Sequence, residues 1–99
     1  MSLRIRALRE DNDFLQKEIA CILSITQTGY SKYETGENSV PLDSLKYLSY
    51  FYDVSMEYLV GISDVQDLPE PSPEAAGEYR LYRKMFLDLK ASHASGGSV

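Results

Sequence analysis

Apolar residues recur at helical spacing in several short segments of the first 61 residues. Over residues 3–10, 14–23 and 42–52 they fall three or four positions apart, which places them on one face of an α-helix. Thr26 is a suitable N-cap for a further helix, and Gly36 is a suitable residue just beyond its end. Ser55 and Gly61 bracket a shorter helix, residues 56–60, in the same way. The pattern predicts an all-α fold that begins with five short helices.

A change of pattern separates these helices from the end of the chain. Residues 63–73 contain three of the four prolines and no helical spacing, so we expect an extended linker. Helical spacing returns over residues 74–91, and residues 92–99 are small and polar, as in a flexible tail. The predicted organisation is a domain over residues 1–62, then the linker, one amphipathic helix and the tail.

Cysteine usage and hydropathy limit the class of protein. A single cysteine, Cys21, excludes an internal disulfide and any multi-cysteine metal site. It lies in an apolar run, residues 19–23, so we expect a buried free thiol and a reducing compartment. The first residues lack the apolar core of a secretory leader, and no stretch approaches the roughly 18 apolar residues of a membrane span. We therefore expect a cytoplasmic protein without a membrane partner.

The segment SITQTGYSKYETG, residues 24–36, has an unusual outer face for a helix. Its outward positions carry amide and hydroxyl groups with one lysine, at Gln27, Thr28, Ser31, Lys32 and Thr35. The second helix of a helix-turn-helix enters the DNA major groove, where such groups match the donors and acceptors of base edges. Gly29 is a poor helix residue, and its small size would allow close approach to the DNA. An ordinary polar helix face is the alternative interpretation.

Residues 4–61 resemble the Cro and phage-repressor family of helix-turn-helix domains, often called the XRE family. The resemblance lies in LRED at 8–11, QKEIA at 16–20, ITQTGYSKYETG at 25–36 and VPLDSLKYLSYFYDVSMEYLVG at 40–61. It implies a five-helix lambda-repressor-like DNA-binding domain, here with an added C-terminal helix. It also implies a sequence-specific transcriptional regulator, a repressor of the kind that binds double-stranded operator DNA.

The resemblance assigns roles to individual positions of this chain. The expected base-reading residues are Gln27, Thr28, Ser31 and Lys32, of which Ser31 is added for its side-chain chemistry. The expected contacts to the DNA backbone are Gln16, Lys17, Thr35, Gly36 and Asn38, although Lys17 fits a plain surface charge equally well. Arg9 and Glu34 match an ion pair that ties the first helix to the third.

Three residues depart from the family pattern. Leu15 stands where Ser or Thr usually caps the second helix, which weakens that helix start by about 1 kcal/mol. Ser24 replaces the glycine common in the turn, where a left-handed backbone would be strained. Gly29 stands where Ser or Thr is frequent, so one possible DNA contact is absent.

The charge balance counts against an indiscriminate nucleic-acid binder. The net charge is −5, and residues 1–61 hold six Lys or Arg against nine Asp or Glu, a local balance of −3. With few cations for phosphates, we expect a shallow dependence of DNA affinity on salt. The acidity also favours an alternative function, a protein-interaction module resembling an antitoxin, in which DNA binding is weak or lost.

The helix over residues 74–91 is expected to form a homodimer interface. One apolar stripe of this helix contains Tyr79, Tyr82, Met85, Phe86 and Leu89. Four more tyrosines lie earlier in the chain, at positions 47, 50, 52 and 58. Aromatic residues are enriched at interfaces, and this mode of DNA binding usually pairs two half-sites. The stripe could instead fold onto its own domain, and the tyrosines could be partly buried surface residues.

No enzymatic activity is expected. His93 falls in the predicted tail and Cys21 in a core pattern, so they form no plausible nucleophile and base. The sequence has no phosphate-binding loop, dinucleotide fingerprint or metal-ligand cluster. We therefore expect no cofactor, no metal and no small-molecule ligand.

Overall fold

All regular structure in the described residues, 3–97, is helical. The computed structural model contains α1 (Ile5–Asp11), α2 (Gln16–Ile22), α3 (Gln27–Thr35), α4 (Leu42–Tyr52), α5 (Met56–Leu59) and α6 (Ala76–Gly97), and this part of the chain has no strand. The all-α prediction is confirmed, and the first five helices lie close to their predicted bounds. None of the described helices is long and apolar enough to cross a membrane.

The core lies between the first five helices and is rich in aromatic residues. The buried apolar residues are Ile5, Phe14, Ile19, Ala20, Tyr30, Leu48, Phe51, Tyr52, Val54 and Leu59. Phe14 and Phe51 are in contact at the centre, with ring centroids 5.7 Å apart. Most of these residues occupy the apolar positions that predicted the helices, so the spacing of the sequence leads directly to this core.

Local hydrogen bonds set where α3 and α5 begin, and the conformation of a glycine sets where α3 ends. The Thr26 hydroxyl accepts from the Gly29 N–H at 3.0 Å, and the Ser55 hydroxyl accepts from the Tyr58 N–H at 3.0 Å. Gly36 follows α3 with φ of +84°, a conformation that glycine adopts without steric cost. The three predicted helix-boundary residues, Thr26, Ser55 and Gly36, are thus confirmed.

The tight turn between α2 and α3 places Ser24 in the left-handed region, with φ of +59°. Two hydrogen bonds close the turn, Ser24 N–H to the Cys21 carbonyl at 3.0 Å and Ile25 N–H to the Ala20 carbonyl at 2.9 Å. The strain expected for a non-glycine residue here is therefore present. The turn determines the direction in which α3 leaves α2.

Helix α2 begins without a capping side chain, as the sequence indicates. Leu15 offers no acceptor, but the Glu18 carboxylate reaches back and accepts from the Leu15 N–H at 2.8 Å. This is one half of a capping box, so one otherwise unpaired backbone donor is satisfied. The expected weakness at this helix start is partly offset.

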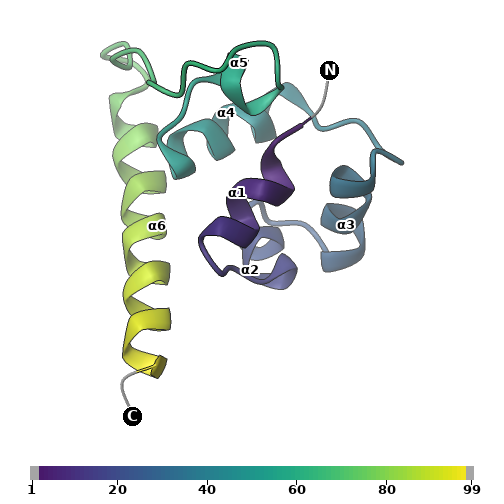
Figure 1. Ribbon diagram of the computed structural model, residues 1–99. Coiled ribbons are helices and arrows are strands. Elements are labelled where there is room, and N and C mark those ends of the chain that lie inside the picture. Colours follow the sequence, from purple (N-terminus) through teal and green to yellow (C-terminus); the bar gives the residue numbers. More distant parts are fainter. Residues whose placement is uncertain (1–2, 98–99) are drawn as a thin grey trace.

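Helix α6 packs along α4 and lies on the opposite side of the molecule from α3 (Figure 1). The predicted end at residue 91 and the predicted flexible tail are corrected, because the helix continues to Gly97; residues 98–99 lie outside the described part. The preceding linker is extended, and its first part is bonded to the domain. Ser55 donates from its N–H to the Gln66 carbonyl at 2.7 Å and from its hydroxyl to the Val65 carbonyl at 3.0 Å.

Cys21 is exposed, so the prediction of a buried thiol is wrong. Helix α2 turns Ile19 and Ala20 into the core, and Cys21, one position further along, faces solvent. The apolar run did not show which of its residues face the core. A free cysteine behaves as a small apolar residue, so its presence in the run did not indicate whether it is buried or exposed.

Candidate nucleic-acid interface

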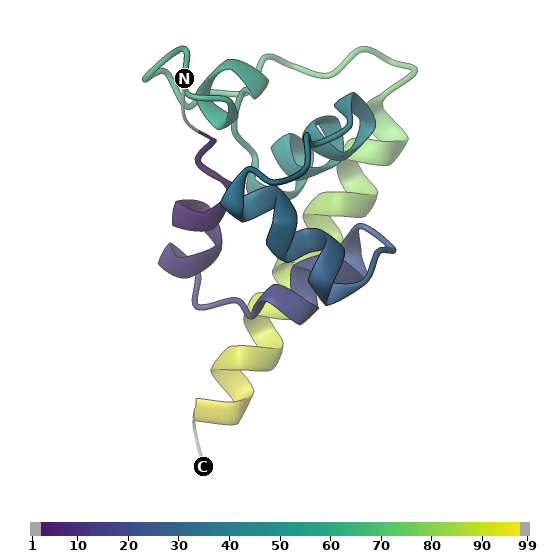
Figure 2. The ribbon, with the colours of Figure 1, turned by 90° about the vertical axis from the view of Figure 1, so that its right-hand side faces the viewer.

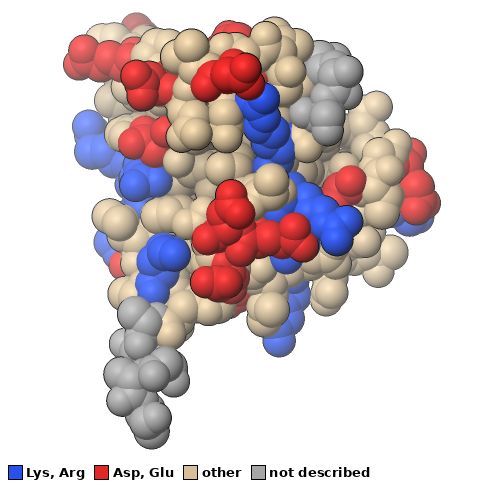
Figure 3. Space-filling model, viewed as in Figure 1, with Lys and Arg blue, Asp and Glu red and all other residues tan. Residues whose placement is uncertain are grey.

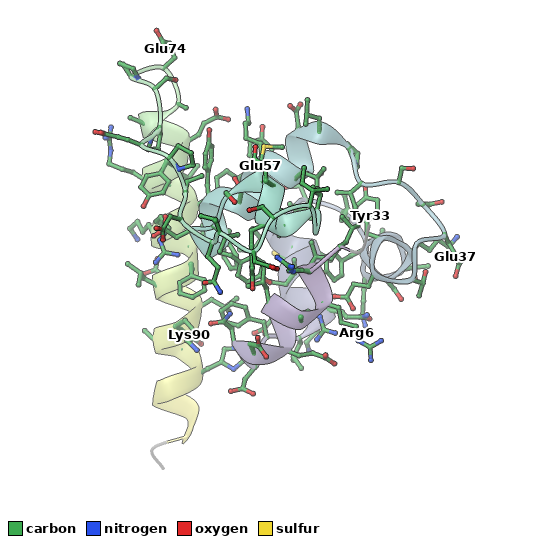
Figure 4. The ribbon with its side chains drawn as sticks, turned by 45° about the horizontal axis from the view of Figure 1, so that its top comes forward. Arg6, Tyr33, Glu37, Glu57, Glu74 and Lys90 are labelled. Atoms are coloured by element: carbon green, nitrogen blue, oxygen red, sulfur yellow. The ribbon has the colours of Figure 1, made fainter. Side chains whose placement is uncertain are left out.

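Helix α3 has an aromatic inner face and a polar outer face. Tyr30 is fully buried, and Tyr33 packs against the core and meets Tyr30 edge to face, with ring centroids 6.5 Å apart. Tyr33 lies on the side of α3 that faces the rest of the domain (Figure 4). Seen from the side in Figure 2, α3 lies in front, and no other helix covers it from that side.

The four expected base-reading residues occupy that outer face. Gln27, Thr28 and Lys32 are exposed and Ser31 is half-buried. They line one open depression of about 520 Å³ together with Gln16 from α2 and Glu37 from the loop after α3; the lining residues are Gln16, Gln27, Thr28, Ser31, Lys32 and Glu37. The structure thus brings together the four residues expected to read bases and one residue expected to contact the DNA backbone. Glu37 was not singled out by the sequence pattern.

The buried carboxylate of Glu34 connects α3 to α1 and α2. The Arg9 guanidinium donates to it through Nε at 2.7 Å and through Nη2 at 3.0 Å, and the Gln16 amide donates at 3.0 Å. The side chains of Arg9 and Glu34 are only 13% and 3% exposed. The predicted ion pair is confirmed, and its two-pronged geometry is the strong form of this interaction.

Hydrogen bonding outweighs burial in setting the protonation of Glu34. Burial by itself would raise the pKa of this carboxyl, but the hydrogen bonds from Arg9 and Gln16 bring its pKa below the ordinary value. The charged form is therefore the stable one in the folded protein. Burial also raises the pKa of the Tyr30 hydroxyl well above its usual range, so this group stays neutral.

Gln16 reaches the edge of the depression while its amide nitrogen is held by Glu34. A primary amide has two N–H donors, so one remains for a phosphate oxygen after the bond to Glu34. Thr35, Gly36 and Asn38 are exposed at the other end of α3, and Lys17 is exposed on α2. These four expected backbone contacts lie outside the lining of the depression.

Gly29 has a local role at the start of α3. A Cβ built at this position would lie 3.2 Å from the Thr26 hydroxyl oxygen, the same atom that accepts the Gly29 N–H. A larger residue would crowd the cap, so glycine preserves room for this hydrogen bond. This contact within the chain gives a physical reason for the glycine that does not depend on DNA.

The expected dimer stripe of α6 contacts the same chain. Tyr82 stacks on Tyr47 of α4, with ring centroids 4.7 Å apart and planes 11° apart. Phe86 packs edge-on against Phe14 and Phe51, at 5.6 and 5.3 Å between centroids. All five residues of the stripe, Tyr79, Tyr82, Met85, Phe86 and Leu89, are half-buried. Of the two possibilities left open by the sequence, the structure has the stripe folded onto its own domain.

The surface around the site carries charges of both signs. In Figure 3 acidic side chains gather over α1 and α2 in the middle of the face, with basic side chains beside them. Within the depression Lys32 and Glu37 are the two charged lining residues, one of each sign. The outer face of α3 is therefore polar and nearly neutral, which favours hydrogen-bonded recognition over attraction by charge alone.

Comparison with known proteins agrees with this architecture. A model of the helix-turn-helix family matches residues 5–59, the segment from α1 to α5. An uncharacterized HTH-type transcriptional regulator of Bacillus subtilis, YobD, is 31% identical over 93 residues, which cover 94% of this chain and 76% of that protein. The cryptic phage CTXphi transcriptional repressor RstR of Vibrio cholerae is 30% identical over 87 residues, which cover 75% of this chain and 78% of that protein.

No solved structure is significantly similar to this chain. The family match nevertheless spans more than half of the 99 residues and contains the turn, the cap at Thr26 and the whole of α3. With the Arg9–Glu34 pair and the polar face of α3 in place, these findings agree on one assignment. The chain belongs to the helix-turn-helix family, of the XRE type first suggested by its resemblance to Cro and the phage repressors.

Proposed function

We propose that this helix-turn-helix transcriptional regulator is a repressor that occupies operator DNA by inserting α3 into the major groove. The observation that carries the proposal is the exposed polar set on the outer face of α3, which lines an open depression beside α2. The inner face of the same helix is fully engaged with the core through Tyr30 and Tyr33. Only the outer face is available to a partner.

The side chains of this face have the chemistry of base recognition. The Gln27 amide can pair with the N6 and N7 of adenine, and the Lys32 ammonium with the O6 and N7 of guanine. The Thr28 hydroxyl can donate or accept, and its methyl group can contact a thymine methyl. Gln16, Lys17, Thr35, Gly36 and Asn38 would then flank the groove and contact phosphates and sugars, which set register rather than sequence preference.

We propose repression in the cytoplasm by a homodimer. Repression is supported by the name of the Vibrio phage relative, and dimerisation by the pairing of half-sites about 34 Å apart in this mode of binding. The α6 stripe is occupied within the chain. It can serve as the dimer interface only if α6 leaves its own α4 and packs on the partner's. Light scattering of the full chain, alone and with operator DNA, measures the oligomeric state.

Operator binding is tested by titrating the protein against a labelled library of duplexes drawn from its own genome. We expect a small set of preferred duplexes, and we expect the double variant Gln27→Ala, Lys32→Ala to lose about 10- to 100-fold in affinity for them. Lys84→Ala is the matched control, because Lys84 is exposed on α6 and its nearest partner is Asp88 at 2.8 Å. It should bind like the wild type.

The opposite result would favour the protein-interaction alternative. If the wild type prefers no duplex, or if the double variant binds as tightly as the wild type, then α3 does not read bases. A polar centre argues against a protein-binding face, because interface cores are depleted of charge and enriched in aromatic residues.

A further inference from the structure

Glu37 introduces a negative charge into the surface that would meet DNA. It follows Gly36 directly, its side chain lines the depression together with Lys32, and it is exposed. Figure 4 shows it projecting beyond α3, away from the body of the molecule. DNA-binding surfaces are usually rich in cations, so an acid at this position needs a physical account.

The contacts of Glu37 leave its charge uncompensated. Its carboxylate accepts from the Thr35 hydroxyl at 3.4 Å, a long and therefore weak hydrogen bond. Among the described residues, no nitrogen of a lysine, arginine or histidine lies within 4.0 Å of it. Glu37 thus differs from Glu34, whose charge is paired with Arg9 and directed inward.

The position of Glu37 in the chain places it near phosphates rather than base edges. The N-terminal residues of a recognition helix reach deepest into the groove, and its C-terminal end lies nearer the backbone. Glu37 lies two residues beyond the last residue of α3 and beside Thr35 and Gly36, both expected to contact the backbone. A carboxylate there would approach phosphates of any duplex, and the like charges would repel.

We propose that Glu37 limits the affinity of this protein for all duplex DNA by repelling the phosphate backbone, so that stable binding depends on the base contacts of α3. The inference rests on the proposed DNA-binding function. Nonspecific binding comes almost entirely from attraction between cations and phosphates, so the repulsion leaves little of it. Such a protein would spend less time on non-operator DNA.

The test replaces Glu37 by glutamine, which keeps the size of the side chain and the acceptor for Thr35. Affinity of the 99-residue chain for a preferred duplex and for a random duplex is measured by fluorescence anisotropy over a range of salt concentrations. We expect Glu37→Gln to tighten binding to both duplexes by about threefold to tenfold. We also expect a steeper fall of affinity with salt, by up to about 0.9 in the slope of log K against log salt.

Glu74→Gln is the matched control. Glu74 is exposed and lies near the start of α6, on the far side of the molecule from Glu37 (Figure 4). The same substitution there should change either affinity by less than about twofold, because charges separated by more than a Debye length are screened. An equal gain in both variants would mean that net charge alone matters, which would overturn the role assigned to Glu37.

Other outcomes separate this inference from the proposed function. Unchanged affinity in Glu37→Gln overturns the inference alone. Weaker binding to the preferred duplex alone also overturns it, and would indicate that the carboxylate accepts a hydrogen bond from a cytosine amine. If the wild type shows no sequence preference but Glu37→Gln still tightens binding to random duplex, operator recognition fails, and of the inference only the repulsion of phosphates by Glu37 stands. If neither protein binds any duplex, both proposals fail.

Discussion

Helices α3 and α6 lie on opposite sides of the molecule and use their side chains in opposite ways. Helix α3 leaves a polar, nearly neutral face open to solvent, and the buried Arg9–Glu34 ion pair ties its inner side to the domain. Helix α6 turns its largest aromatic residues inward, where they stack on α4 and cover Phe14. The polar pattern of α3 indicates a binding surface, whereas the apolar pattern of α6 indicates only that the stripe is covered. The stripe does not specify which chain covers it.

The largest expected effect is on stability, from removing an aromatic ring of α6. Phe86 contacts Phe14, Phe51 and Tyr52, so we expect Phe86→Ala to lower the free energy of unfolding by about 3–4 kcal/mol. Leu87→Ala should have little effect, because Leu87 is 57% exposed on the same helix. Urea unfolding followed by circular dichroism measures both variants.

The dependence of unfolding on protein concentration tests whether α6 packs on its own chain. If α6 packs within the chain, the urea midpoint is the same at low and high protein concentration. A midpoint that rises with concentration in the wild type but not in Phe86→Ala would show that α6 packs on a partner, since association stabilises the folded state by mass action. That result would remove the contrast between the two helices.

The next largest expected effect is on stability, from removing the cation of the Arg9–Glu34 pair between α1 and α3. Arg9→Met leaves the Glu34 carboxylate buried without its cation, and we expect a loss of roughly 3 kcal/mol in the free energy of unfolding at pH 7.5. In the wild type the pKa of Glu34 is lowered, so its contribution to stability is present above the ordinary carboxyl pKa and is lost as the pH falls through the folded-state value.

The pH dependence of the difference identifies its cause. In Arg9→Met burial would dominate and raise the pKa of Glu34, so protonation would stabilise the variant as the pH falls. We therefore expect the gap between wild type and variant to narrow at pH 4.5, measured by urea unfolding at both pH values. A gap of constant size would show that the variant suffers from lost packing rather than from an unpaired charge.

Much of this architecture could be predicted from the sequence because its causes are local. Thr26, Gly36 and Ser55 set helix boundaries through hydrogen bonds and conformations within a few residues, and α3 carries its polar face in consecutive turns. Long-range placement could be predicted only where the family resemblance supplied it, as for the Arg9–Glu34 pair. The α6 stripe, the exposure of Cys21 and the continuation of α6 to Gly97 all depend on neighbours distant in sequence or on the phase of a short helix.

The site was only partly predictable for the same reason. The four positions proposed to read bases share one helix face, so their juxtaposition follows from helical periodicity. Glu37 lies in a loop without periodicity, and only the structure shows that it joins that surface. Its position directly after Gly36 was the one signal available in the sequence.

The smallest expected effect lies in the turn that orients α3. Ser24 has φ of +59°, a conformation that costs a residue with a Cβ about 1 kcal/mol or more and costs glycine little. Glycine also gains freedom in the unfolded chain, so we expect Ser24→Gly to raise the free energy of unfolding by only about 0.5–1 kcal/mol. Ser24→Ala keeps the Cβ and should give no such gain.

Because the hydrogen bonds that close the turn use backbone groups, the direction of α3 in Ser24→Gly should be unchanged and DNA affinity should equal that of the wild type. A stabilised variant with altered affinity would mean that the strained serine, and not only the polar face of α3, tunes how this helix meets its partner.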